Sequence, residues 1–388
     1  MNLHVSHQHP VTGALHHLNT SSYQLEVEEL LSHAGIEIGG NEPWDIQVHN
    51  PDFYQRLLAH GSLAFGESYM DGWWDCQDLD GMIARILKAR LDDHQTWDLR
   101  LAALKARIFN LQSPARAFEV GRRHYDLDSH LYGAMLGRRR VYSCGYWAQA
   151  EDLDTAQEAK LELVFRKLGL KPGMRVLDIG CGWGETLKLA TERYGVTGVG
   201  ITISEEQCKY AQALCQGLPV EFRLMDYRNL DERFDRILSI GMLEHVGHKN
   251  YRTYMEMARR CLKDDGLFLL HTIGSNVSVH DTDPWIAKYI FPNGMLPSIR
   301  QIGESLEGLF VMEDWHNFSA YYDRTLMAWR DNFESHWDEL RGDLDERFHR
   351  MWLFYLSSCA ASFRVRRNQL WQLVLSPEGV PGGYVAPR

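Results

Sequence analysis

The stretch VLDIGCGWG, residues 176–184, constrains the fold of this chain more than any other. It is typical of a buried strand that ends at an acidic residue, Asp178, and then turns on three glycines into a helix. Glycines at such a turn let the backbone pass close to a ligand. A nicotinamide dinucleotide site requires GxGxxG and an acid about 20 residues later. Here Glu185 takes the third glycine position, and the next strand ends in GIT without an acid. The turn is either a cofactor site of another kind or a purely structural connection, and we predict a cofactor site.

Strands and helices alternate regularly through the second half of the chain. Strands are predicted at 174–179, 196–201, 220–225, 235–240 and 266–272, with helices at 184–194, 204–216 and 250–262. Two further strands, 311–318 and 370–375, flank long helices at 320–341 and 344–367. This rhythm predicts an α/β fold with an open parallel sheet, in which ligands bind beyond the carboxyl ends of the strands.

Charge indicates where the domains divide. Residues 1–110 carry 15 acidic and seven basic side chains, whereas residues 111–142 carry three acidic and six basic ones. This change, with the Ser113-Pro114 pair, predicts a linker near 105–120. We therefore expect a flexible tail over 1–20, a small N-terminal domain over 21–112 and a second domain over 113–388.

Composition excludes several classes of protein. The formal charge of −11 argues against a general nucleic-acid binder. Seven cysteines without a CxxC pair, and no signal peptide, indicate a reducing, cytoplasmic compartment. No apolar run approaches the ~18 residues of a membrane span, so any membrane contact is expected to be peripheral.

Two features of the N-terminal region leave alternatives open. The histidines before residue 20 form a metal site or belong to a floppy tail; we favour the tail and expect no metal, because no Cys or acid joins them. From residue 23 the pattern predicts a helix ending at Gly35, a short strand near 43–48, and a helix–break–helix over 52–75. Tyr69, Trp73 and Trp74 form either a core, the commoner use, or a lipid-facing surface.

Polar side chains follow several of the predicted strands where those strands end. They are Asp178, Thr202, Gln207, Asp226, Glu244, His245 and His271. Each alone is explained as a capping or solvated residue. Because all these strand ends lie on one rim of a parallel sheet, we expect the side chains to converge on a single pocket.

Several segments, in order along nearly the whole chain, resemble the bacterial cyclopropane-fatty-acyl-phospholipid synthases. They are HYDLDSHLYGAMLGRRRVYSCGYW (124–147), VLDIGCGWG (176–184), GITISEEQ (200–207), GMLEHVG (241–247), LHTIG (270–274) and FPNGMLP (291–297), with SYMDGWWD near the N-terminus. The resemblance implies a seven-stranded, Rossmann-like S-adenosylmethionine methyltransferase fold for the catalytic domain, 113–388, with a smaller, mainly helical and lipid-associated N-terminal domain. Asp128-Ser129, where the family often has Gly-Asn, and extra arginines at 137–140 are the departures.

The resemblance also implies a role for individual residues. Contacts to S-adenosylmethionine are expected from Tyr142, Ser143, Asp178, Gly180, Gly182, Thr202, Gln207, Asp226 and Tyr227. Of these, Tyr142 and Ser143 would meet the methionine end, and Asp226 and Tyr227 the adenine. A bicarbonate site is expected from Cys144, Glu244, His271, the backbone of Ile273, and Tyr322.

The implied activity is transfer of a methylene unit from S-adenosylmethionine to the cis double bond of a phospholipid acyl chain. Methyl transfer would be followed by deprotonation by bound bicarbonate, which closes a cyclopropane ring. The alternatives are another methyltransferase of the same fold, which leaves a methyl branch or methylates a small amine, and a non-catalytic lipid-binding protein.

The expected partners follow from that substrate. We expect a cytoplasmic homodimer that binds the inner face of a bilayer peripherally and binds no nucleic acid. Arginines at 116, 122, 123 and 138–140 either face anionic headgroups or form a solvated basic surface. Residues 347–367 are apolar almost all round, which favours a buried helix over a surface anchor.

Overall fold

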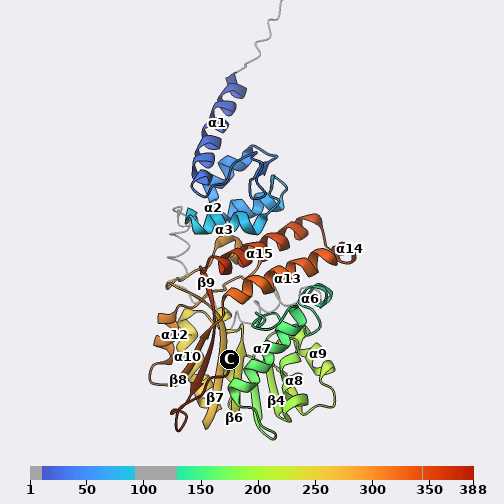
Figure 1. Ribbon diagram of the computed structural model, residues 1–388, viewed down its shortest axis with the longest axis vertical. Helices are drawn as coiled ribbons and strands as arrows, with labels where there is room; N and C mark the ends of the chain where they lie inside the picture. The colour runs from blue at the N-terminus through green and yellow to red at the C-terminus, as the bar shows by residue number, and fades with distance from the viewer. Residues whose placement is uncertain (1–10, 92–128, 343) are drawn as a thin grey trace, which may run out of the picture.

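The computed structural model describes residues 11–91, 129–342 and 344–388. A sheet with helices on both faces forms one end of the molecule, and the N-terminal helices form the other (Figure 1). Helices α13 (Ala320–Ser335) and α15 (Glu346–Arg364) lie between these two parts. The expected linker near 105–120 falls outside the described residues.

The sheet has seven strands in the order β5-β4-β3-β6-β7-β9-β8. The strands are β3 (Arg175–Ile179), β4 (Thr197–Thr202), β5 (Val220–Leu224), β6 (Phe234–Ile240), β7 (Leu262–Ser275), β8 (Val311–Asn317) and β9 (Asn368–Ser376). Strands β3 to β7 pair in parallel, and β9 runs antiparallel to both of its neighbours. The chain order reverses beside β3, which is where open α/β sheets bind ligands. The predicted α/β fold is confirmed.

Helices cover both faces of this sheet (Figure 1). One face carries α7 (Leu153–Leu168), α8 (Glu185–Tyr194) and α9 (Glu205–Leu214), and the other carries α10 (Tyr251–Cys261) and α12 (Ile299–Leu306). Each face buries its own apolar layer. The caps explain where the helices begin: Asp152 accepts the Thr155 N–H at the start of α7, and Ser204 accepts the Gln207 N–H at the start of α9.

Two predicted boundaries are wrong. Strand β7 begins at Leu262 rather than 266, because Leu262 pairs with Phe234 of β6 although charged residues follow it. The helix predicted over 320–341 is divided into α13 and α14 (Trp337–Leu340) at His336, whose φ of −105° and ψ of 7° leave the helical range.

The N-terminal part is mainly helical, as expected. It contains α1 (Val11–Ser32), α2 (Asp52–Met70), α3 (Leu79–Lys88) and a two-stranded sheet of β1 (Gln47–Val48) and β2 (Trp74–Asp75). Helix α1 therefore includes the second half of the segment expected to be a tail, and residues 1–10 lie outside the described residues. The predicted break in α2 falls at Gly61, with φ 55° and ψ −132°.

The aromatic residues of this part form a core and not a lipid-facing surface. Trp74 is fully buried, and its ring lies 4.5 Å from that of Phe65 and 4.9 Å from that of Tyr69. Phe354 of α15 completes the cluster, with its ring 5.7 Å from that of Tyr69. Trp73 is only partly buried, beneath the guanidinium of Arg56. The N-terminal helices thus share their core with α15.

Ion pairs reinforce this contact. Asp80 of α3 lies between Arg330 of α13, at 2.6 Å, and Arg364 of α15, at 2.7 Å. Burial opposes ionisation of Asp80, but the hydrogen bond from Arg364 and the charge of Arg330 hold the pKa of the carboxyl below its usual value. Helix α15 is a buried helix, as predicted, because one side packs on the N-terminal helices and another on α13.

Short elements connect these parts. They are α6 (Ser129–Leu136), α11 (Pro284–Tyr289), η2 (Tyr227–Asn229), η3 (Leu243–His245) and η4 (His248–Asn250). Across the ranges that the structure describes, every helix is too short or too polar to cross a bilayer.

Candidate active site

A pocket opens at the carboxyl ends of β3, β4, β5 and β6. Its lining includes every residue predicted to contact the cofactor: Tyr142, Ser143, Asp178, Gly180, Gly182, Thr202, Gln207, Asp226 and Tyr227. These residues come from the ends of three strands, β3, β4 and β5, and from the segment that precedes α7. The expected convergence on a single pocket is met in part, because Glu244 and His271 lie outside the lining. The strand-end residues that do line it are Asp178, Thr202, Gln207, Asp226 and His245. The contact that each residue makes with a ligand stays a prediction.

The glycine turn between β3 and α8 forms one wall of this pocket. Gly180, Gly182 and Gly184 all have positive φ, at 81°, 52° and 87°. A Cβ on Gly184 would lie 2.8 Å from the Cβ of Ala211, so this glycine allows α8 to pack against α9. A Cβ on Gly182 would meet nothing within 4 Å, because this residue faces the pocket. The three glycines thus serve close packing on one side and ligand access on the other.

Charged and polar groups line the rest of the rim. Burial raises the pKa of Asp178 to about 7, against the opposing charge of Lys160. The Thr202 hydroxyl donates a hydrogen bond to Gln207 Oε1 at 3.0 Å, which holds both side chains beside the carboxyl end of β4. Asp226 already accepts hydrogen bonds from the backbone and the guanidinium of Arg228, at 2.9 and 2.8 Å. A ligand beside Asp226 would therefore meet a paired carboxylate.

The residues predicted to hold bicarbonate lie outside the lining of this pocket, and all of them are buried except Ile273, which is partly buried. Glu244 Oε1 accepts the Ile273 N–H at 2.6 Å, whereas its Oε2 has no partner among the described residues. His271 Nδ1 lies 3.2 Å from the amide nitrogen of Gln372, and its Nε2 likewise has no partner in the described ranges. Two buried polar atoms are thus left for a further group, which buried polar atoms require.

The pKa values of these two groups favour neutral forms. Burial raises the pKa of Glu244 to about 7, against the hydrogen bond from Ile273. Burial lowers the pKa of His271 well below its usual value, and the charges of Lys160 and Lys167 lower it further. Because the Gln372 amide donates to Nδ1, the neutral imidazole carries its hydrogen on Nε2. His271 Nε2–H is therefore a hydrogen-bond donor for which no described residue is the acceptor.

Cys144 and Tyr322 belong to one apolar cluster, against which Ile273 also packs. Burial raises the pKa of the Cys144 thiol well above its usual value, so the thiol stays neutral and is a poor nucleophile. Thr325 of α13 joins this segment to the helix of Tyr322, since its hydroxyl accepts the Gly145 N–H at 3.0 Å. The cage that the resemblance implies for these residues stays a prediction.

Three positioning residues were missed by the sequence analysis. Gln157 and Lys160 of α7 are fully buried and hydrogen-bond to the 141–143 segment, and Gln372 of β9 is buried against His271. Polar residues on the apolar side of a helix, between Ala156 and Leu161, were the available signal.

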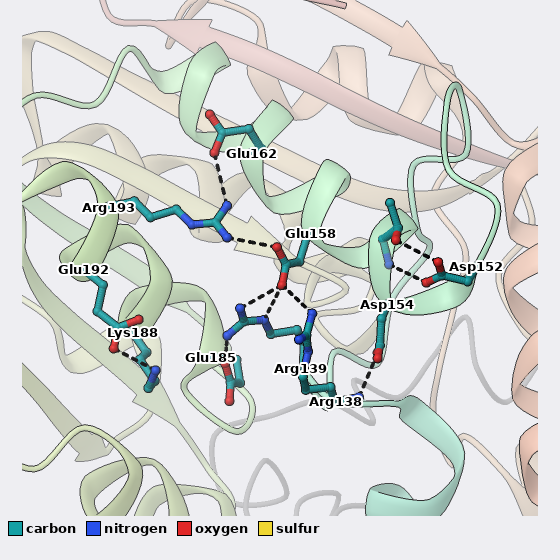
Figure 2. A network of polar contacts seen from close by, with 11 residues as sticks. Arg138, Arg139, Asp152, Asp154, Glu158, Glu162, Glu185, Lys188, Glu192 and Arg193 are labelled. Atoms are coloured by element: carbon teal, nitrogen blue, oxygen red, sulfur yellow. Dashed lines mark hydrogen bonds and ion pairs between the residues drawn. The ribbon is translucent and has the colours of Figure 1, made fainter.

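The sequence left open whether the arginines at 138–140 face lipid headgroups or form a solvated basic surface, and the structure shows ion pairs of Arg138 and Arg139 within the molecule. Arg138 and Arg139 both bind Glu158 of α7, and Arg139 also binds Glu185 at the start of α8 (Figure 2). The Arg139 side chain is only 17% exposed, and Arg140 lines the pocket with its guanidinium over the Tyr210 ring. These residues therefore hold the pocket segment against the sheet. The arginines at 116, 122 and 123 lie outside the described residues.

Known proteins resemble this chain in sequence and in fold. The family model of mycolic acid cyclopropane synthetase matches residues 112–373. The chain belongs to this family. Within the mycolic acid cyclopropane synthetase family, it is similar to the cyclopropane-fatty-acyl-phospholipid synthase of Escherichia coli. That relative is 55% identical over 93% of this chain and 94% of its own length. The predicted family is confirmed.

Two other members of the family extend the comparison. The tuberculostearic acid methyltransferase UfaA1 of Mycobacterium tuberculosis is 31% identical over 86% of this chain and 83% of its own. The crystal structure of mycolic acid cyclopropane synthase CmaA1, complexed with SAH and CTAB, superposes with a TM-score of 0.62 at 32% identity. It covers 66% of this chain and 97% of that one. The predicted methyltransferase fold is confirmed as well.

Proposed function

We propose that this chain is a cyclopropane-fatty-acyl-phospholipid synthase. It transfers a methylene unit from S-adenosylmethionine to the cis double bond of a phospholipid acyl chain. The observation that carries the proposal is the 55% identity to the Escherichia coli enzyme of that name over 93% of this chain. The rim pocket and the buried pair of Glu244 and His271 behind it support the proposal.

The chemistry explains why two adjacent sites are needed. An alkene is a weak nucleophile, and the methyl group of a sulfonium is a strong electrophile. Attack of the alkene on that methyl breaks the carbon–sulfur bond, forms a carbon–carbon bond and leaves a carbocation. Loss of a proton from the new methyl then closes the ring. The rim pocket holds the methyl donor, and the buried site must accept the proton without itself being methylated.

The buried site fits bicarbonate. When ionised, Glu244 can accept the hydrogen bond of a hydroxyl at Oε2, and His271 Nε2–H can donate to an oxygen, so together they match a small group with both. When bound, bicarbonate supplies a base that is small, held in place and not covalently attached to the protein. Tyr322 and the backbones of Ile273 and Cys144 would complete the enclosure, and preorganised groups of this kind are usually the largest catalytic contribution.

A second candidate is a methyltransferase that leaves a methyl branch on the same acyl chain. The similarity to the tuberculostearic acid methyltransferase supports this second candidate. Both reactions need the same donor, so the product distinguishes them. A cyclopropane has lost the double bond and gained one CH2, and its ring resists hydrogenation conditions that reduce an alkene.

Incubating the protein with S-adenosylmethionine and vesicles of an unsaturated phospholipid is expected to convert the acyl chains to their cyclopropane forms. Mass spectrometry and proton NMR of the extracted lipid measure the mass gain and the ring protons. Gly182→Val protein is the negative control. Branched unsaturated product, formed when the carbocation loses a proton without closing the ring, would transfer the assignment to the second candidate. Unchanged lipid with consumed donor would contradict both.

We also propose that the enzyme acts as a cytoplasmic homodimer that binds the inner face of the membrane peripherally. The phospholipid substrate supports the membrane contact, and the family resemblance supports the dimer. Analytical sedimentation tests the dimer, and a monomer at working concentration would contradict it.

Binding to anionic vesicles is expected to be reversible and sensitive to salt, because surface charges are screened over about 10 Å at 0.1 M salt. Co-sedimentation with anionic vesicles at low and high salt measures it, with zwitterionic vesicles as the control. Since Arg138 and Arg139 are paired internally, replacing both with Gln is expected to loosen the pocket segment and leave vesicle binding nearly unchanged. Equal binding to both kinds of vesicle at low salt would contradict the electrostatic contact.

A further inference from the structure

A buried lysine lies behind the wall of the pocket. Lys160, on α7, has 0% of its surface exposed, and its Nζ donates to Ser143 Oγ at 2.9 Å. Ser143 lines the pocket, whereas Lys160 does not. Burying an ammonium costs considerable free energy unless it is paired, so a lysine at such a position requires an explanation beyond packing.

Its helix neighbour makes a different contact with the same segment. Gln157, one turn earlier on the same face of α7, donates to the backbone carbonyls of Ser143 at 2.7 Å and Val141 at 3.3 Å. Gln157 therefore holds the backbone of the segment in place. Lys160 instead contacts the Ser143 side chain, so it determines the direction in which the Ser143 hydroxyl group points its hydrogen.

The direction of the hydrogen bond determines what Ser143 offers to a ligand. An ammonium donates only, so Ser143 Oγ accepts from Lys160, and the hydroxyl hydrogen remains for another acceptor. Within the described residues no acceptor takes that hydrogen. Ser143 therefore presents a donor to the pocket, backed by a positive charge.

We propose that Lys160 is a positioning residue which, acting through Ser143, selects ligands that carry a carboxylate at the amino-acid end. The inference rests on the proposed function, since the ligand is the amino-acid portion of S-adenosylmethionine and of its product. Burial lowers the pKa of Lys160 to about 7, against the opposing charge of Asp178. A bound carboxylate would favour the ammonium form of Lys160, because an opposite charge nearby stabilises it.

The affinities of two ligands distinguish a role of Lys160 in selecting the carboxylate from a purely structural role. S-adenosylhomocysteine carries the amino acid, whereas 5′-methylthioadenosine has the same nucleoside and thioether without it. In Lys160→Met, affinity for S-adenosylhomocysteine is expected to fall at least about tenfold, the usual effect of losing a hydrogen bond to a charged group. Affinity for 5′-methylthioadenosine is expected to stay within about twofold. Isothermal titration calorimetry of the full chain measures both.

The matched controls use neighbouring residues. Ser143→Ala is expected to give the same selective loss without altering α7, so it keeps the test valid if Lys160→Met fails to fold. The double variant should lose no more than Ser143→Ala alone, because the two residues act as one unit. Gln157→Met, which removes a buried polar side chain one turn away, should weaken both ligands alike.

The outcomes distinguish this inference from the proposed function. If the native protein binds neither ligand, the proposed cofactor is wrong. If the native protein binds both, and Lys160→Met weakens both equally or leaves both unchanged, only the role of Lys160 is overturned. Additive losses in the double variant would also overturn it, since Lys160 would then act independently of Ser143.

Discussion

Replacing Glu244 with alanine is expected to lower turnover by roughly 10²–10³-fold, by analogy with the removal of one preorganised donor from an oxyanion site. The variant loses both the acceptor of the Ile273 N–H and the unpartnered Oε2 behind the pocket. Affinity for S-adenosylmethionine should change little, because Glu244 lies outside the pocket lining. The loss should therefore appear in kcat and not in ligand binding.

Transfer of labelled methyl into lipid measures this effect, in buffers depleted of bicarbonate and supplemented with it. His271→Ala is expected to lose less turnover than Glu244→Ala. Added bicarbonate should partly restore the turnover of the less active variant. Glu313→Ala is the matched control, since its carboxylate also accepts a backbone N–H, that of Val380 at 2.7 Å, but lies on β8. Native turnover by Glu244→Ala in depleted buffer would contradict the bicarbonate site and favour the methyl-branching alternative.

Gly182→Val is expected to abolish binding of S-adenosylmethionine. The residue has a φ of 52°, a conformation that costs an ordinary L-residue about 1–2 kcal/mol and a β-branched one more. Its side chain would also project into the pocket, where no protein atom lies within 4 Å of the added Cβ. Calorimetry should detect no binding. Asp178→Ala is expected to have the same effect through lost pocket geometry.

A substitution at a second glycine distinguishes backbone strain from blocking of the pocket as the cause of lost binding. Gly217 has a φ of 87° and equally open surroundings, but it lies outside the pocket lining. Gly217→Val therefore carries a similar backbone cost without blocking the ligand, and it should retain affinity with reduced stability. Unchanged affinity in a folded Gly182→Val protein would remove the cofactor assignment.

Much of the fold follows from local sequence patterns. The strand–turn–helix at 176–194 is specified by a run of apolar residues, three glycines and the period of α8, so each level of the sequence agrees with the others. The polar residues at strand ends converge for the same reason, because parallel strands place their carboxyl ends on one rim. Boundaries such as Leu262 were less predictable, since strand pairing with Phe234 overrides a charged local sequence.

Contacts between distant segments could not be predicted in this way. Arginines at 138 and 139 look like a free basic patch in sequence, and only the packing of α7 and α8 brings Glu158 and Glu185 to them (Figure 2). Gln372 likewise reads as an ordinary polar residue until β9 pairs beside His271. Neither partnership has a signature within its own segment.

The position of α15 also sets the order in which the chain can complete itself during synthesis. Arg350 of α15 binds the backbone carbonyl of Tyr69, 281 positions earlier, and Phe354 completes the aromatic cluster around Trp74. At roughly 5–20 residues per second, the N-terminal segment waits about 15–55 s after leaving the ribosome before α15 emerges. In a nascent chain the apolar surface around Trp74 therefore stays incompletely covered until α15 has emerged.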